Sequence, residues 1–551
     1  MTVALLGLIA ASIAAPPHTE PTPPLYIEGI GFVHSFAAIN DTRSHGTVGD
    51  AFLSLNEVIQ LNKGALLESQ LSSAEQAQLF GPPGDVAFGT IDTDVITRIT
   101  LERDLDDIVE TIHGLQIAGL SDKPEPTIDL NGTRGLWADS SWVDFRNMVL
   151  ENAAVAITVN QDAALFGTTV ENVRFRNISQ IGIQLNTSTD NEQTRLQVDR
   201  CDFLNVPTAV EINDGGQDRR GNLLMVDSSV RGGQRGLVAN LGVGGELTVI
   251  LDRTDIQGAD LAIGLLRASA ANTRRVSVSG LHLTAIGNTT GLQIDGAAGI
   301  ADSLTLRMGD LGGSAHGLRA GSPGSALSAT IEDGRVAGGI DLTTSTDSGL
   351  ALRNLRLRQG SMNLGAGSGS IQVADTIFDR VNLATQGGAA VLVDASCLLA
   401  GSVQGLPSAP LTVQGSYVNG TTIGTDATVS GSLPAQQLGS MDVSPRPASI
   451  GTTVTLQSDL PPGLTGIWLF GFAETIPFIG PPPLHIYFWV SPPIFVTLPV
   501  FVRGTDTTPV PIPNNQRLLG SDFVIQMAVI ADPGMTAPEL SLPPGRLLPL
   551  R

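Results

Sequence analysis

The sequence is poor in cysteine, in lysine and in aromatic residues. Its 551 residues include only two cysteines, Cys201 and Cys397, and only two lysines, Lys63 and Lys123. Two cysteines cannot build the dense disulfide framework of small secreted domains. Aromatic residues make up 4% and charged residues 15% of the chain, whereas 63 residues are glycine. This composition suits many short turns rather than a helical bundle, and 42% hydrophobic residues are too many for a disordered chain.

Positive charge and long apolar runs are also scarce. The formal net charge is −22 and the pI is near 4.6, which disfavours nucleic acids and anionic membrane surfaces as partners. No apolar run reaches the length of a transmembrane helix, and the nearest candidate, 464–501, is interrupted by seven prolines. We therefore expect no transmembrane segment and no nucleic-acid partner.

The first residues have the pattern of an export signal. "MTVALLGLIAASIAA" (1–15) is apolar and ends in small residues, although no Lys or Arg precedes the apolar run. It predicts a signal peptide cleaved near Ala14 or Ala15, followed by a Pro-rich spacer over 16–25. We expect a secreted or cell-surface protein that is a monomer.

One short pattern recurs along most of the chain. "LQVDRCDFLN" (196–205) has apolar residues on both sides of a polar turn, and similar stretches return every 20–28 residues. A fixed period in this range indicates a solenoid, and two or three short strands per repeat indicate a parallel β-helix of about 12 or more rungs over 85–435. The inward-facing anchor positions of the aligned repeats are Phe145, Val170, Val198, Val226, Leu251, Val278, Leu306, Ile331, Leu352, Val373, Val393 and Val413.

The repeat also predicts the state of the two cysteines. Asp199 and Arg200 form the turn of their repeat, and Cys201 occupies a small, stacked position beside it. Cys397 lies eight rungs further along. Eight rungs at about 4.8 Å each separate the thiols by nearly 40 Å, whereas a disulfide requires Cα atoms within about 7 Å. Both thiols are therefore expected to be free.

Two regions resemble known proteins. "LSLNEVIQL" (53–61), "ITRITLERDLDDI" (96–108) and "PTIDLNGT" (126–133) resemble the entry region of bacterial secreted right-handed β-helix proteins of the pectate-lyase-like class. This resemblance implies a right-handed helix with an N-terminal cap region, 26–84, whose short helix covers the open end. From "SPRPASIGTTVTLQSDLPPG" (444–463) onward, the chain resembles a C-terminal module of planctomycete secreted proteins. Its alternating strands and Pro/Gly turns predict a β-sandwich over 436–551.

Four acidic residues follow the anchors of successive repeats: Glu171, Asp199, Asp227 and Asp252. If they align, their carboxylates lie about 5 Å apart, a ladder that calcium would suit. The resemblance adds that lyases of this fold hold calcium with acidic residues and use an Arg or Lys as base. The alternative is a solvated turn in which Arg174, Arg200 and Arg253 compensate the acids. No other cofactor is indicated.

An aromatic cluster stands in the C-terminal region. "LHIYFWV" (484–490) places Tyr487 and Trp489 on one side of a strand, where exposed rings could stack on sugars. The alternative is that the rings pack in the core of the sandwich.

Two functions remain open at this level. One is a structural, adhesive or glycan-binding protein without catalytic activity, whose partners are polysaccharides or other cell-surface components. The other is a calcium-assisted polysaccharide lyase or a glycoside hydrolase. The chain offers carboxylates but no isolated base beyond its arginines and two lysines, which favours the first.

Overall fold

A computed structural model describes residues 36–549 with gaps, among them 89–97, 109–114, 215–219, 365–370, 480–486 and 513–521. The predicted signal peptide (1–15) and Pro-rich spacer (16–25) lie outside the described residues.

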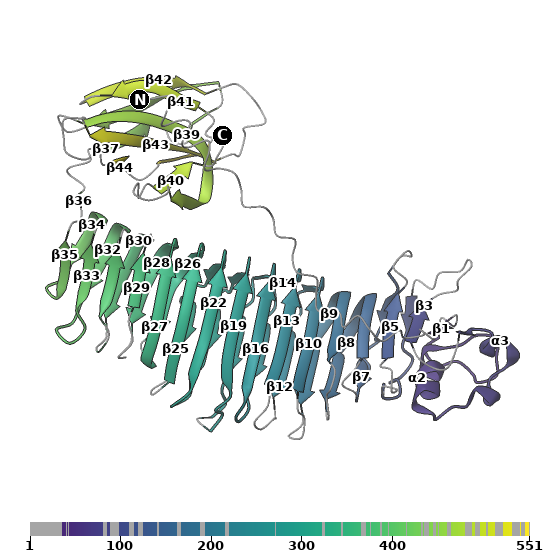
Figure 1. The fold of residues 1–551 in the computed structure, drawn as a ribbon. Helices are drawn as coiled ribbons and strands as arrows, with labels where there is room; N and C mark the ends of the chain where they lie inside the picture. The colour runs from purple at the N-terminus through teal and green to yellow at the C-terminus, as the bar shows by residue number, and fades with distance from the viewer. Residues whose placement is uncertain are drawn as a thin grey trace.

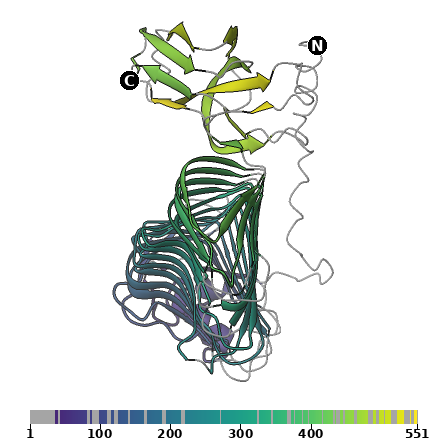
Figure 2. The same cartoon turned by 90° about the vertical axis from the view of Figure 1, so that its left-hand side faces the viewer.

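The described chain is an all-β protein dominated by a parallel β-solenoid (Figure 1). Strands of successive turns pair in parallel and superimpose when the solenoid is viewed end-on (Figure 2). The all-β prediction and the stacked repeat are therefore confirmed.

The strands form three faces. The first face consists of β1 (Phe36–Ile39), β3 (Asp85–Phe88), β5 (Leu115–Gly119), β8 (Val143–Gln161), β9 (Thr168–Thr187), β10 (Gln193–Asp199), β13 (Arg220–Val226), β16 (Glu246–Asp252), β19 (Arg275–Leu281), β22 (Ala301–Arg307), β25 (Ser325–Glu332), β27 (Ser345–Arg353), β29 (Ile371–Ala374), β31 (Val391–Asp394), β33 (Leu411–Gln414) and β35 (Ala427–Ser430). The second face contains β4 (Arg98–Thr100), β6 (Thr127–Asp129), β11 (Asp202–Leu204), β14 (Ser229–Arg231), β17 (Asp255–Gln257), β20 (Thr284–Ile286) and β23 (Asp310–Gly312). The third contains β7 (Leu136–Ala138), β12 (Thr208–Asp214), β15 (Arg235–Asn240), β18 (Leu261–Leu266), β21 (Thr290–Ile294) and β24 (His316–Ala320). The long strands β8 and β9 bend around all three faces, since each pairs with strands of all of them.

In each of the later turns, one strand replaces the separate strands of the second and third faces. These strands are β26 (Arg335–Leu342), β28 (Arg356–Leu364), β30 (Ile377–Thr385), β32 (Cys397–Gln404), β34 (Tyr417–Ile423) and β36 (Leu433–Pro434). β26 pairs with both β23 and β24, and a bulge at Ala337/Gly338 replaces the loop that separates those two strands. The loss of this loop explains why the repeat length falls from 25 residues (331 − 306) to 21 (352 − 331).

A single apolar core, built from several inward columns, runs through the solenoid. Val170, Val198 and Met225 are register partners on β9, β10 and β13, and all three side chains are fully buried. On the second face the rings of Phe175 and Phe203 stack with centroids 4.4 Å apart. Burial alternates along first-face strands such as β13, β16 and β19. Each turn thereby contributes apolar residues to one continuous core.

The register corrects two of the twelve predicted anchors. Met225, not Val226, occupies the anchor position of its turn, so that the prediction was wrong by one residue there. In the β19 turn the anchor position belongs to Gly280 rather than Val278. The place that a Gly280 side chain would take is filled by the Leu306 side chain. A glycine cannot reveal an inward-facing position from sequence, and this made the apolar Val278 the wrong choice.

The predicted sharp turn follows the first face. Its central residue has a left-handed backbone in successive turns, with φ near +50°. These residues are Asn147, Asn172, Arg200, Asp227, Arg253, His282, Met308, Asp333 and Asn354. Five of these nine residues are Asn or Asp, whose short polar side chains tolerate this conformation best.

At the N-terminal end, helix α2 (Leu55–Lys63) lies beyond the first strands (Figure 1). Ser54 caps it through a reciprocal capping box with Glu57, and its apolar side is buried in the core cluster, as the sequence predicted. A 3₁₀ turn (Glu68–Gln70), helix α3 (Ser73–Gln76) and β2 (Leu79–Phe80), which is antiparallel to β1, complete the described cap.

The C-terminal region contains two antiparallel sheets. One comprises β37 (Ser440–Ser444), β38 (Thr453–Asp459) and β42 (Thr505–Pro511). The other comprises β39 (Leu464–Ile479), β40 (Tyr487–Val490), β41 (Val496–Val502), β43 (Asp522–Ala531), β44 (Leu540–Ser541) and β45 (Arg546–Pro549). These are the sheets from which the predicted β-sandwich would be built.

Small hydroxyl residues stack beside the turn and bond from one turn to the next. The Ser396 hydroxyl donates to Asp394 O at 2.8 Å and accepts from the Thr376 N–H at 3.2 Å. The Ser416 hydroxyl repeats the arrangement by accepting from the Ser396 N–H at 3.0 Å. These buried hydroxyls satisfy backbone groups that the turn removes from the strand ladder.

Ser396→Ala should therefore destabilise the solenoid. The substitution leaves the buried Thr376 N–H without this acceptor, at a cost of about 1–3 kcal/mol. We expect a lower midpoint of guanidinium unfolding, whereas Ser279→Ala, at an exposed position of β19, should leave the midpoint unchanged. Equal midpoints for the two variants would contradict a structural role of the hydroxyl stack.

Candidate functional site

Fewer acidic residues share one register column than the sequence predicts. Asp199 is the register partner of Glu171 on one side and of Val226 on the other, and Val226 in turn pairs with Asp252. Asp227 lies one residue later, at the left-handed turn position. The structure therefore brings Glu171 and Asp199 together, separates them from Asp252 by an apolar residue, and moves Asp227 out of the column.

Arginines alternate with these acids. Arg200 bonds to Glu171 and lies 3.7 Å from Asp199 (Nη2 to Oδ2). Arg253 contacts Asp227 at 2.5 Å through Nε and Asp252 at 2.6 Å through Nη1. Arg146 adds a second cation to Glu171 at 3.3 Å. All four predicted acids therefore pair with arginine.

Arg174 behaves differently from the other two predicted arginines. It points to Glu125, 3.3 Å away, instead of to the acidic column. Arg146, which sequence reasoning missed, takes its place. The signal was available, because Arg146 follows the anchor Phe145 just as Glu171 follows Val170, and the two are register partners.

The pKa values of two acids shift in opposite directions. Burial raises the pKa of Asp199, and this outweighs the attraction of Arg200. Hydrogen bonds from Arg253 lower the pKa of Asp227. The stability that Asp227 contributes is present at neutral pH and is lost as the pH falls through its lowered pKa. The contribution of Asp199 is present only at low pH and is lost as the pH rises through its raised pKa. The paired acids thus give no common pH response.

Among the described residues, no group of three or more His, Cys, Asp or Glu side chains has a geometry that could hold a metal ion. In the same part of the chain, no helix is both long and apolar enough to cross a membrane.

Calcium should not change the stability of the protein, because arginines already neutralise Glu171, Asp199, Asp227 and Asp252. We expect equal melting temperatures in EDTA and in millimolar calcium, measured by differential scanning calorimetry on the full chain. Asp199→Asn is the control. A rise of several degrees with calcium that this variant abolishes would establish a cation site at the column.

Cys201 is a structural residue of the turn. It is 2% exposed, and its Sγ lies 3.3 Å from Val170 O. Burial raises the pKa of its thiol to about 12. The thiol therefore stays protonated at neutral pH and does not form the reactive thiolate. Its N–H donates to the Ser228 hydroxyl at 3.1 Å, so Cys201 belongs to the same column as the stacked hydroxyls.

Cys201 is free, as the sequence predicted. Cys397 begins β32, and the pairings β11–β14–β17–β20–β23–β26–β28–β30–β32 place it eight strands further along. Eight steps of about 4.8 Å span about 38 Å, so the backbone excludes a disulfide between them. The Cys397 side chain lies outside the described residues.

Thiol titration checks this assignment. In guanidinium chloride without reductant, the chain should titrate two thiols, because no intramolecular disulfide can form. In the native protein at neutral pH, Cys201 should not react, which is best measured in a Cys397→Ser variant. Rapid labelling of native Cys201 would contradict its burial.

The predicted aromatic site falls on β40. Tyr487 is the register partner of Ile479, and Trp489 lies two residues later on the same strand. The orientation and exposure of both side chains lie outside what the structure describes, so that sugar stacking by Tyr487 and Trp489 stays a prediction.

A ladder of asparagines on the third face was missed. Asn186 Nδ2 donates to Asn160 Oδ1 at 3.0 Å, Asn213 to Asn186 at 3.0 Å, and Asn240 to Asn213 at 2.7 Å. Asn160 in turn donates to Asp139 at 2.7 Å. An Asn recurs near the end of the third-face strand in four successive repeats, so the sequence contained a signal for this ladder.

The comparisons with known proteins add no relative. No protein-family model matches the sequence, and no curated protein matches it significantly. The resemblance of 53–61, 96–108 and 126–133 to pectate-lyase-like proteins therefore stays a prediction, and the structure shows the parallel β-solenoid.

Proposed function

We propose that this is a secreted or cell-surface β-helix protein with a structural, adhesive or glycan-binding role and without catalytic activity. The observation that carries the proposal is the pairing of the acidic column with Arg146, Arg200 and Arg253. An acid or base catalyst needs a group held ready for proton transfer. Here the carboxylates and guanidiniums neutralise one another.

The asparagine ladder supports a scaffold role. Side-chain amides of Asn160, Asn186, Asn213 and Asn240 bond from turn to turn along the third face. Such bonds hold neighbouring turns in one register and keep the outward surface regular. A regular, rigid surface suits attachment to a repeating polymer such as a polysaccharide, because repeated weak contacts then add up.

Polysaccharide pull-down and digestion test the proposal together. The full chain should be retained on at least one insoluble or immobilised glycan, and no polysaccharide should lose chain length during incubation, measured by size-exclusion chromatography and reducing-end assay. Retention without cleavage supports the proposal. Cleavage that Arg200→Gln or Arg253→Gln abolishes would contradict it and would favour a lyase, whereas cleavage unaffected by either would place catalysis elsewhere in the chain.

A further inference from the structure

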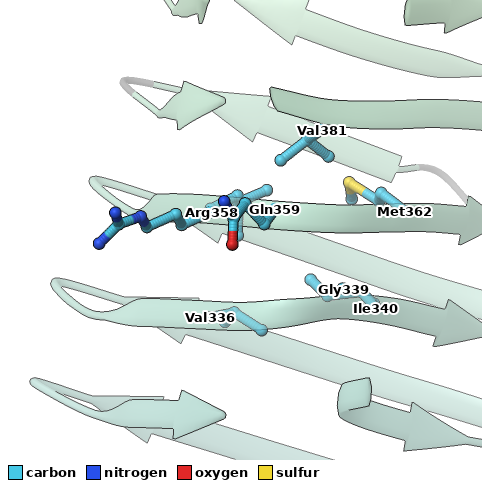
Figure 3. A pocket seen from close by; sticks show the side chains of 8 residues that line it. Val336, Gly339, Ile340, Arg358, Gln359, Met362 and Val381 are labelled. Carbon is cyan, nitrogen blue, oxygen red and sulfur yellow. The ribbon is translucent and has the colours of Figure 1, made fainter. Parts of the chain in front are cut away.

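Two imperfections of the described interior differ in kind. A small void between β26, β28 and β30 is lined mainly by apolar side chains, among them Val336, Met362 and Val381, and the Arg358 guanidinium points away from it (Figure 3). Such a void costs only the apolar contacts that it lacks. In the N-terminal cap, by contrast, Glu57 Oε1 is buried without a hydrogen-bond partner. Burial of such a group costs far more when the group is charged.

Two glutamates occupy equivalent positions in the two α-helices of the cap. Glu57 is the third residue of α2, and Glu75 is the third residue of α3. Each closes a capping box with the serine that precedes its helix, Ser54 or Ser72. The two residues are 2% and 0% exposed. The cap therefore contains the same motif twice, at nearly equal burial.

The hydrogen bonds of the two carboxyl groups differ. Both oxygens of Glu75 accept from the Gly49 N–H at 3.0 Å, and its Oε2 also accepts from the Ser72 N–H at 2.6 Å. Glu57 uses only Oε2, which accepts from the Ser54 N–H and the Ser54 hydroxyl at 2.8 Å each. The surroundings of Glu57 thus suit a neutral carboxylic acid, whose carbonyl oxygen accepts both bonds while the other oxygen carries the proton.

Other acids lie close to Glu57. Asp50, in the loop before α2, and Glu75 on α3 both repel its negative charge. Asp41 is also near, because a side chain on Gly46 would lie 2.9 Å from Glu57 Oε2 and 3.1 Å from Asp41 Oδ2. Burial, assisted by the charges of Glu75 and Asp50, raises the pKa of Glu57 and outweighs its hydrogen bonds.

The positive charges near α2 bond to other acids. These ion pairs, at 2.8, 2.8 and 3.9 Å, are Arg43 with Asp41, Arg43 with Asp50, and Lys63 with Asp107. Toward the solenoid, α2 meets a further acid, Asp106, whose carboxylate accepts from Gln60 at 2.7 Å. His45 bonds to Asp104 O at 3.2 Å, and burial lowers its pKa. A negative charge on Glu57 would therefore have no positive partner among the described residues.

We propose that Glu57 is a proton-controlled latch of the N-terminal cap. Its carboxyl group is protonated while α2 is seated on the end of the solenoid, and loss of that proton releases α2. Leu55, Val58 and Ile59, which are buried in the core cluster, then become exposed together with the edges of the first strands. The latch is independent of the proposed glycan-binding role and would stand without it.

The raised pKa fixes the direction of the response. In the released helix Glu57 ionises in the ordinary range of glutamate, whereas in the seated helix it ionises at higher pH. The seated state is therefore fully favoured below the ordinary range and loses this advantage as the pH rises through the raised pKa. Between these two values the opening equilibrium grows by about tenfold per pH unit, and above the raised pKa it stays constant.

A lysine-specific protease measures the opening of α2. The chain has only two lysines, and Lys63 is the last residue of α2, so cleavage after Lys63 requires the helix to open. We would measure this cleavage rate on the full chain from pH 5 to 8.5 by mass spectrometry. Division by the rate for a synthetic peptide of residues 54–69 removes the pH dependence of the protease itself. The ratio should rise by at most about tenfold per pH unit and then level off.

Glu57→Gln and its matched control Glu75→Gln assign the response to one residue. Glutamine also closes a capping box, so α2 should still be seated in Glu57→Gln, and its cleavage ratio should not change with pH. Glu75→Gln alters the same motif at the same burial and should keep the rise. A flat ratio in the wild type would overturn the proposal without any substitution. A rise that persists in Glu57→Gln, or that Glu75→Gln abolishes as completely, would overturn it as well.

Discussion

The rest of the structure depends on the in-register pairing of parallel strands from turn to turn. This pairing repeats about every 4.8 Å and places each residue directly beside its equivalent in the next turn, as Val170, Val198 and Met225 show. The inward columns merge into one apolar core. The outward columns are more constrained. The charge and the hydrogen-bonding groups of each outward residue must be compatible with those of the equivalent residue in the turn on either side.

Uncharged polar columns meet this requirement by bonding to themselves. Asparagine is both donor and acceptor, so Asn160, Asn186, Asn213 and Asn240 can form a continuous ladder. Serine and threonine do the same with the backbone beside the turn. Charged columns cannot, since like charges repel. Arg200 and Arg253 therefore alternate with the acids, whereas Arg335 and Arg356 form a like-charged pair within the solenoid.

The sequence predicted the solenoid, its turn and ten of its twelve anchors, because apolar spacing and left-handed turn residues are local signals. It misplaced the anchor by one residue at Val226 and by two residues at Val278. A glycine at position 280 hides an inward-facing site, and a shift of two residues leaves the alternation between inside and outside unchanged. The pairing of Arg200 with Glu171 was foreseen as an alternative, but only the register of neighbouring turns could show that Asp227 leaves the column.

The cross-section of the solenoid changes at β26, and no local pattern in the sequence predicts this change. When β26 replaces two strands and a loop, a bulge must turn the chain within one strand, first at Gly338 and Gly339 and then at Gln359 and Arg380. A side chain on Gly338 would meet Gly313 O at 1.8 Å, so glycine is required at the first bulge. The next two turns place Gln359 and Arg380 in the left-handed region at this bulge, and glycines with positive φ return beside it at Gly360 and Gly401. The side chains of Gln359 and Arg380 bond to each other there, since the Gln359 amide oxygen accepts from Arg380 Nη1 and Nη2 at 3.1 and 3.2 Å, and this bond offsets part of the cost of the left-handed backbone.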